Sequence, residues 1–200
     1  GPFGFMDEYD AGFICNHSDH NGRYAFNQQP YIGLWNLSCL AQALLPLAEK
    51  GALKAALEGY QPPLERESLR LMRAKVGLQD ERAEDERLIR AWLGLLQESH
   101  ADYTIAFREL GSFSSQESAT NDRLREHFVN REHFDEWAKS YRDRLQSERS
   151  LDQERQVRMN RVNPKYVLRN YLAQVAIEKA QQKDFSEIDR LFALLQNPYS

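Results

Sequence analysis

The chain has 200 residues, 42% of them hydrophobic and 28% charged, which is typical of a globular protein with a sizeable core. Its 26 Lys and Arg against 30 Asp and Glu give a net charge of −4, which argues against a dedicated nucleic-acid-binding protein. A mean hydropathy of −0.70 without any run near ~20 apolar residues argues against a membrane span, and two cysteines exclude a disulfide-rich scaffold.

Residues 1–30 are rich in Gly, Asp, Asn and aromatic residues and lack a helical period, so we predict an extended loop. At most a short strand is expected in it, at residues 12–15. Loops of this length in a compact domain are often functional. Large rings predict that the loop folds back on a scaffold and shapes a site; they are Phe3, Phe5, Tyr9, Phe13, Tyr24, Phe26 and Tyr31.

Residues 31–110 are predicted to be helical, because apolar residues recur there at three- and four-residue spacing. Pro30 fits the first turn of the first helix, where its missing N–H costs little. The charged run at residues 80–86 interleaves arginines with acids and is interpreted as a solvated face. The apolar stripes start at Leu34, Leu53, Leu64, Leu88 and Tyr103 and end at Leu45, Leu57, Val76, Leu96 and Leu110.

Residues 111–121 contain four serines and are predicted to be a flexible connection to a second helical portion, residues 122–200. One helix is expected around Trp137, and another after Asn163-Pro164, interpreted as an N-cap followed by proline. Asp184 with Glu187 predicts a capping box for the last helix. Residues 141–170 carry eight basic and four acidic side chains, interpreted as a charged surface face. The sequence therefore predicts a mostly α fold without internal repeats.

The segment around Cys15 holds the residues with the most reactive side chains. In an extended chain Cys15, His17 and Asp19 share a face, and a metal site at Cys15, His17 and His20 is one hypothesis. A hydrogen-bonded polar loop is the alternative, because structural zinc sites usually take ligand pairs from two separated segments. Cys39 is predicted to be a small buried hydrophobe and Cys15 an exposed, reactive thiol; a disulfide between them is left open.

No nucleophile elbow or phosphate-binding loop is visible, but several blocks resemble a known family. The resemblance is dense over residues 1–45, looser at 72–78, and returns near 163–170 and 197–198. The blocks are Gly1-Pro2-Phe3-Gly4-Phe5-Met6-Asp7, Phe13-Ile14-Cys15-Asn16-His17-Ser18-Asp19, Gly22-Arg23-Tyr24-Ala25-Phe26, Gln29-Pro30, Leu34-Trp35-Asn36-Leu37, Met72-Arg73-Ala74-Lys75, Gly77-Leu78, Asn163-Pro164-Lys165-Tyr166, Leu168-Arg169-Asn170 and Asn197-Pro198. With these blocks the chain resembles the selenoprotein O family of protein-kinase-like proteins.

The resemblance implies a protein adenylyltransferase, which moves AMP from ATP onto Ser, Thr or Tyr hydroxyls with Mg²⁺ or Mn²⁺. It implies a kinase-like helical lobe at residues 31–110, preceded by an activation-segment-like loop at 1–30 and followed by a helical C-terminal extension at 122–200. In relatives, the metal-binding aspartate lies in an Asp-Tyr pair directly before Gly-Pro-Phe-Gly. The other nucleotide-binding groups lie further upstream. No catalytic, ATP-binding or metal-binding residue is therefore assigned to this chain.

Both ends of the sequence look like cuts through a longer protein, so we expect a C-terminal fragment that binds no nucleotide and is inactive alone. The expected partners are the upstream part of the same protein and its protein substrates, with neither nucleic acid nor membrane. No targeting signal is visible; the resemblance implies a cytoplasmic location in a bacterium or a mitochondrial one in a eukaryote. Cys15 matches a family cysteine that pairs near the C-terminus. The alternative is a non-enzymatic redox or protein-interaction module centred on Cys15.

Overall fold

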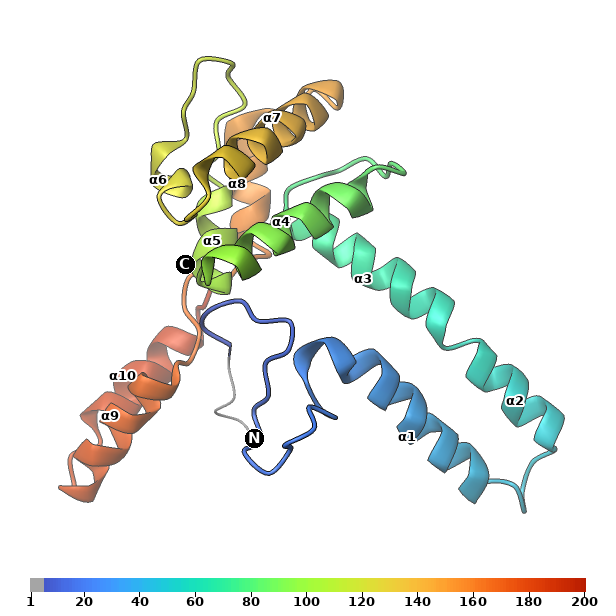
Figure 1. Ribbon diagram of the computed structural model, residues 1–200. Helices are drawn as coiled ribbons and strands as arrows, with labels where there is room; N and C mark the ends of the chain where they lie inside the picture. Colours follow the sequence, from blue (N-terminus) through green and yellow to red (C-terminus); the bar gives the residue numbers. More distant parts are fainter. Residues whose placement is uncertain (1–5) are drawn as a thin grey trace. The chain divides into compact units, whose positions relative to one another are not determined.

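The computed structural model describes residues 6–200, so Phe3 and Phe5 of the predicted loop lie outside the described residues. This part of the chain is mostly helical, which confirms the predicted class, and its only extended pairing is an isolated bridge between Glu8 and Asp102 (Figure 1). It divides into two compact units. Unit 1 comprises the described residues up to Asp10 together with Met72–Ser200, and unit 2 comprises Ala11–Leu71. The domain boundaries expected from the sequence, at residues 30, 110 and 121, stay a prediction.

Unit 2 begins with turns rather than with the short strand considered for residues 12–15. The turn region folds back on itself, because the amide of Phe26 donates to the carbonyl of Phe13 at 2.9 Å. Pro30 lies in the first turn of α1, as predicted. None of the residues of α1 is buried within this unit, although the helix is apolar on all sides. The helices of unit 2 are the 3₁₀ turn η1 (Phe26–Gln28), α1 (Gln29–Ala43), α2 (Lys50–Glu58) and most of α3 (Gln61–Lys75).

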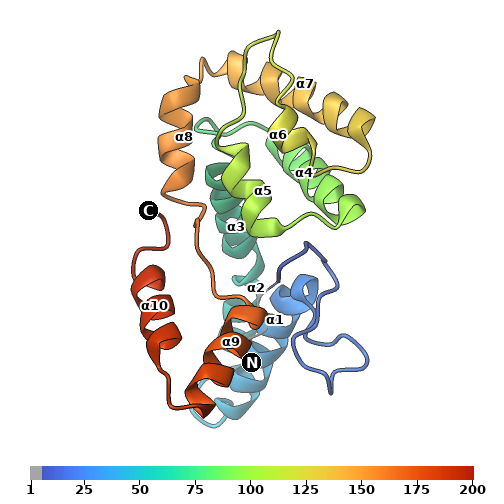
Figure 2. The same ribbon diagram turned by 90° about the vertical axis from the view of Figure 1, so that its left-hand side faces the viewer.

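Unit 1 contains the last turn of α3 and seven further helices of the described chain (Figure 2). Most of them coincide with the predicted stripes; the four-residue α6 and all of α8 were not predicted from the sequence. None of the described helices combines the length and apolar character needed to cross a bilayer. The seven are α4 (Asp85–Ser99), α5 (Tyr103–Leu110), α6 (Asp122–Arg125), α7 (Arg131–Ser147), α8 (Asp152–Asn160), α9 (Asn170–Gln181) and α10 (Ser186–Leu195).

The N-cap predicted at Asn163 is wrong. The side chain of Asn163 is buried and donates to the carbonyl of Lys75 at 2.7 Å, while α9 begins only at Asn170. The predicted capping box at Asp184 is also wrong. The amide of Asp184 already donates to the carbonyl of Lys179 at 3.0 Å, and the carboxylate of Glu187 binds Arg190 instead. At Asn163 a contact with the end of α3 replaces the local cap, whereas Oδ1 of Asp184 still accepts the amide of Ser186 at 3.0 Å, without the reciprocal bond from Glu187.

An aromatic core joins α4, α5 and α7 in unit 1. Trp92 is fully buried, and its ring centroid lies 4.6 Å from that of Trp137 on α7 and 5.9 Å from that of Phe107 on α5. Tyr141, also fully buried, stacks on Trp137 and donates its hydroxyl to the carbonyl of Val76 at 2.6 Å. Aromatic burial of this extent is the main source of stability for these helices.

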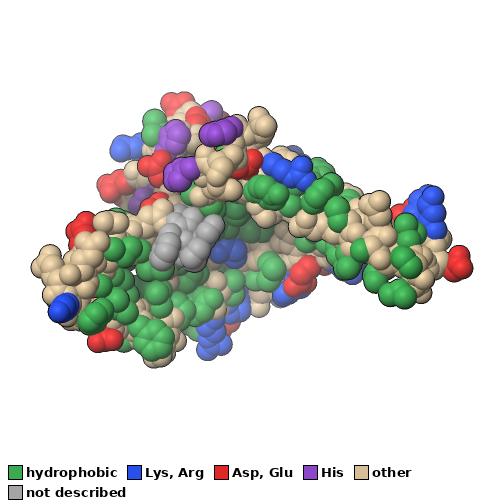
Figure 3. Space-filling view, turned by 90° about the horizontal axis from the view of Figure 1, so that it is seen from below, with side chains coloured by type: hydrophobic (Ala, Val, Ile, Leu, Met, Phe, Trp, Pro, Cys, Tyr) green, Lys and Arg blue, Asp and Glu red, His purple; other side chains and the backbone are tan. Residues whose placement is uncertain are grey.

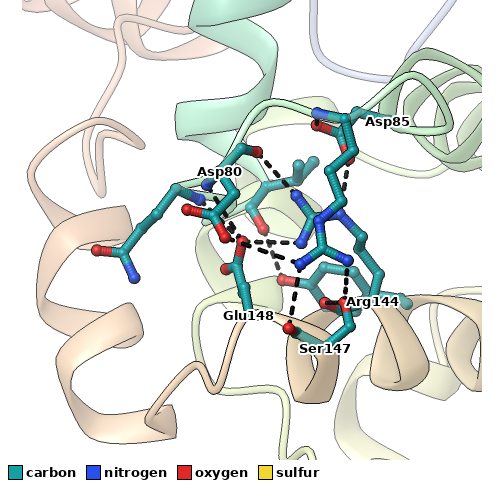
Figure 4. Close-up of polar contacts among 9 residues, drawn as sticks. Asp80, Asp85, Arg144, Ser147 and Glu148 are labelled. Atoms are coloured by element: carbon teal, nitrogen blue, oxygen red, sulfur yellow. Dashed lines mark hydrogen bonds and ion pairs between the residues drawn. The ribbon is translucent and has the colours of Figure 1, made fainter.

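A buried charged network, shown in Figure 4, ties α7 to the segment before α4. Nε of Arg144 lies 2.7 Å from Oδ1 of the fully buried Asp85, and Nη1 lies 2.8 Å from Oε2 of Glu148. Nη2 donates to the carbonyl of Asp80. The interpretation of residues 80–86 as a solvated face is therefore wrong at Asp85. The interpretation of residues 141–170 as a charged surface face is likewise wrong at the buried Arg144 and at the fully buried Arg155.

Gly77 turns the chain between α3 and this network at a φ of +78°. A Cβ atom at this position would lie 2.6 Å from Sδ of Met159 and 2.7 Å from Cγ of Arg155. Only glycine satisfies both the backbone conformation and the close approach of α8.

Helices α9 and α10 form a hairpin whose two helices pack against each other, with Ala173, Ala176 and Leu191 buried between them. Figure 3 shows hydrophobic side chains gathered over this hairpin at the left of the view. A cavity of about 640 Å³ lies along it, lined almost entirely by apolar side chains.

We predict that Arg144→Met destabilises unit 1 by about 3–5 kcal/mol, because it leaves the buried carboxylates of Asp85 and Glu148 without their cation. The measurement is the free energy of unfolding from urea denaturation followed by circular dichroism. Arg90→Met is the matched control, since Arg90 pairs with Glu86 on the exposed face of α4. Equal effects of the two substitutions would contradict the assignment.

Candidate functional site

The segment Met6–Asp10 docks on the helical body of unit 1 through backbone hydrogen bonds. The amide of Tyr9 donates to the carbonyl of Ala101 at 2.9 Å, and the amide of Tyr103 donates to the carbonyl of Asp7 at 2.9 Å. The segment therefore pairs as a short extended stretch with the residues that open α5. We call Asp7, Tyr9, Asp102, Tyr103 and Arg169 the docking cluster, because their side chains reinforce this pairing.

Arg169 joins three parts of the sequence in the docking cluster. Its Nη1 lies 2.6 Å from Oδ1 of Asp7 and also binds Asp102, whose Oδ1 lies 3.1 Å from Nη2. Oδ1 of Asp102 in addition accepts the amide of Ile105 at 2.8 Å and so caps α5. Hydrogen bonding to Asp102, and secondarily to Asp7, raises the pKa of Arg169 above its ordinary value despite its partial desolvation. The guanidinium is thus held by two carboxylates, an arrangement that suits its planar fork of donors.

Two tyrosines form the apolar side of the docking cluster. The buried ring of Tyr9 stacks on that of Tyr103, with centroids 5.7 Å apart and planes at 23°. Burial raises the pKa of Tyr103 to about 12, and burial together with the charge of Asp10 raises that of Tyr9. Both phenols therefore stay neutral at physiological pH. Among the rings of the N-terminal segment, Tyr9 lies against a scaffold as predicted. The prediction is wrong for Tyr24, Phe26 and Tyr31, whose rings are exposed.

Lys75, in the last turn of α3, lies beside the docking cluster. Its Nζ is 4.6 Å from the ring centroid of Phe107 and 5.2 Å from that of Tyr103. Burial lowers the pKa of Lys75 to about 8. The ammonium is thus half-buried against two ring faces, which attract a cation less strongly than the water that they displace.

Several of the blocks that carry the family resemblance meet in this part of unit 1. Asp7 of the first block pairs with Arg169 of the block at residues 168–170 at 2.6 Å, and Asn163 bonds to the carbonyl of Lys75. The amides of Lys165 and Tyr166 donate to the carbonyl of Pro198 at 2.7 and 3.0 Å. Residues as far apart as 7 and 169 are therefore brought together by one three-dimensional arrangement.

The structure also places the candidates around Cys15, in unit 2. Cys15 is exposed, as predicted. The carboxylate of Asp19 accepts the amides of Arg23 and Tyr24 at 2.9 and 2.7 Å, so it closes a turn of the loop. Within residues 6–200, His, Cys, Asp and Glu nowhere gather in the groups of three or more that could hold a metal ion, and Cys15, His17 and His20 form no such group. The geometry favours the polar-loop interpretation of this segment.

The prediction that Cys39 is buried is wrong, because α1 leaves it exposed within unit 2. No disulfide joins it to Cys15. The sequence does place Cys39 on an apolar stripe of α1. However, α1 has apolar residues on every side, and the other residues of unit 2 do not bury them.

Sequence reasoning did not assign a role to Asp102, Arg169 or Lys75. Arg169 and Lys75 were visible only as members of the family-like blocks. Asp102 before the apolar start of α5 is a plain N-cap signal, which would have located the residue but not its second role as the partner of Arg169.

The docking cluster does not have the arrangement of a metal site. Its two carboxylates, those of Asp7 and Asp102, are both paired with Arg169, and its phenols are neutral. The donor sets of the described residues therefore do not fit the Mg²⁺ or Mn²⁺ that the resemblance implies, and no step of a reaction is derived through such an ion.

Comparison with known proteins identifies the family. The family described as protein adenylyltransferase SelO matches residues 1–196. The chain belongs to the SelO family. Its relatives include proteins named protein nucleotidyltransferase YdiU from Myxococcus xanthus (52% identical over 200 residues), Herminiimonas arsenicoxydans (49% over 200 residues) and Cupriavidus pinatubonensis (48% over 214 residues).

These SelO relatives are longer than the sequence compared with them. All of the present chain is covered in each comparison, but it spans only 41%, 40% and 41% of the three relatives. The docking cluster therefore lies in a portion of the family that amounts to about two fifths of its length.

We predict that Arg169→Gln destabilises unit 1 by on the order of 2 kcal/mol, because it leaves two partly buried carboxylates without their charge-assisted hydrogen bonds. Thermal unfolding of the chain measures the loss. Arg90→Gln is the control, since Arg90 pairs with Glu86 one turn away and both side chains are exposed on α4. An effect of Arg169→Gln no larger than that of the control would show that the cluster does not hold the segment.

Proposed function

We propose that this chain is the C-terminal part of a protein adenylyltransferase with a kinase-like fold. Its role is to hold the segment that follows the nucleotide- and metal-binding motif. The single observation that supports this is the docking of Met6–Asp10 through Asp7 and Arg169 in a chain of the SelO family. The family resemblance puts a metal-binding aspartate directly before Gly1. Fixing residues 6–10 therefore anchors the chain within ten residues of that centre.

The proposed reaction is the transfer of AMP to a Ser, Thr or Tyr hydroxyl of a protein substrate. The hydroxyl oxygen forms a bond to the α-phosphorus of ATP, and the bond from that phosphorus to the bridging oxygen of the β-phosphate breaks. Pyrophosphate leaves with the electron pair, and the hydroxyl proton passes to a base. We assign the base, the nucleotide-binding groups and the Mg²⁺ or Mn²⁺ ligands to the portion of the relatives that this chain does not span.

The name of the relatives supports transfer of a nucleotide, and the family description supports AMP as the transferred group. The contribution of this chain is positioning. The docking of Met6–Asp10 anchors the chain close to the metal motif, and misplacement by about 1 Å is enough to slow a reaction of this kind by ~100-fold. The activation-segment-like role of residues 1–30, the cytoplasmic location and the upstream part of the protein as partner belong to the same proposal.

We predict that the 200-residue chain alone shows no saturable Mg²⁺-dependent binding of ATP in isothermal titration calorimetry up to millimolar concentrations. The reason is that its described acidic side chains are not arranged as a metal site. Restoring the upstream part is expected to restore binding, and with it the labelling of protein by ATP carrying a tag on the α-phosphate. Micromolar affinity of the chain alone would overturn the division of roles.

The exposure of Cys15 supports a second candidate, a redox or interaction module centred on this thiol. On that hypothesis Cys15 reacts with iodoacetamide at pH 7 at least about tenfold faster than Cys39, the other exposed cysteine of unit 2, because a redox thiol is activated by its surroundings. Mass spectrometry of the two peptides measures the ratio. Equal rates would remove this candidate and leave the adenylyltransferase proposal untouched.

A further inference from the structure

The ammonium of Lys75 differs from most embedded cations of unit 1 in the chemistry of its partners; Arg158, whose buried Nη2 has no hydrogen-bond partner, is another exception. Among the described residues Lys75 has ring faces beside it and no carboxylate or carbonyl acceptor. Several neighbouring cations have oxygen acceptors at hydrogen-bond distance. They are Arg73 with Glu81 at 3.0 Å, Arg144 with Asp85 at 2.7 Å, Arg155 with Asp152 at 2.8 Å, Arg169 with Asp7 at 2.6 Å, and Arg108 with the carbonyl of Asn160 at 3.0 Å.

The carboxylates of the docking cluster and of the docked segment already have other partners. Asp7 and Asp102 are bound by Arg169, and Glu8 lies 3.7 Å from the imidazole of His100 at the surface. The phenols of Tyr9 and Tyr103 are neutral, because burial raises the pKa of both. No anionic group of the described part of unit 1 is therefore in place to compensate the charge of Lys75.

A half-buried ammonium without an oxygen acceptor costs free energy, because three N–H donors have lost part of their water. The ring faces of Tyr103 and Phe107 offset this only in part. Burial accordingly lowers the pKa of Lys75 to about 8. An oxyanion at this position would remove the cost and would favour the charged form.

We propose that Lys75, beside the rings of Tyr103 and Phe107, is a binding site for an oxyanion that the described residues do not supply. The ligand is a phosphate-type anion or a carboxylate. Its source is either a free ligand or a side chain of the part of the protein that this chain does not span. The site lies next to the docked segment Met6–Asp10, so its occupation also stabilises the surface on which that segment rests. The inference does not depend on the adenylyltransferase proposal.

The test is the pKa of the Lys75 amine, followed by NMR of the ¹³Cε resonance of the 200-residue chain between pH 6 and 11. Without ligand we expect a value near 8. Addition of inorganic phosphate or pyrophosphate is expected to raise it by about one unit, which is a tenfold stronger hold on the proton. The same titration of the longer protein without added anion distinguishes the two sources. If a carboxylate of the protein is the ligand, the pKa of Lys75 is already raised; if a free anion is the ligand, the pKa rises only when phosphate or pyrophosphate is added.

Lys75→Met and Lys75→Arg complete the experiment. Methionine keeps the straight apolar stem and removes the uncompensated charge, so this variant is expected to fold and to lose the phosphate-dependent shifts of the Phe107 and Tyr103 ring resonances. Arginine keeps the charge and retains them. Lys165→Met is the matched control, because Lys165 lies over the ring of Tyr166 but is exposed. A Lys75 pKa that stays near 8 with both anions and in the longer protein would overturn the proposal.

Discussion

The ion pairs of Arg169 with Asp7 and Asp102 are the interaction on which the proposed site depends. They join the first described residues to the start of α5 and to the segment before α9, across 162 residues of sequence in the case of Asp7. A guanidinium held by two carboxylates is directional as well as strong, so it fixes both where the segment Met6–Asp10 lies and which way it runs. The stacking of Tyr9 on Tyr103 adds apolar contact to the same interface.

The helical body behind this interface is held by a different kind of contact. Trp92, Trp137 and Tyr141 supply the apolar core, and Arg144 with Asp85 and Glu148 fixes the loop between α3 and α4 against α7. Buried ion pairs of this kind contribute more to the choice of one arrangement than to net stability, because desolvation offsets much of the attraction. Their consequence is a rigid surface on which a short segment docks in one register.

The docking cluster is built from stretches of sequence that carry the resemblance to the SelO family. In a SelO-family chain that spans about 40% of its relatives, three separated blocks of family-like sequence converge on one small region of unit 1. A segment that leaves a catalytic centre needs a firm attachment on its far side if the centre itself is to be aligned. Lys75, embedded without an oxygen partner next to that attachment, identifies a place where an anion from elsewhere completes the arrangement.

The sequence by itself determined the helical class, because apolar residues recur at three- and four-residue spacing in most of the helices. It also determined the position of Pro30 in the first turn of α1. It also carried the family resemblance. Only the tertiary structure decided the burial of Asp85 and Arg144, the exposure of Cys39 and the use of Asn163 as a link to Lys75. A charged or polar side chain has the same local pattern whether it faces water or a distant partner. Its role is therefore set by contacts that join residues far apart in the chain.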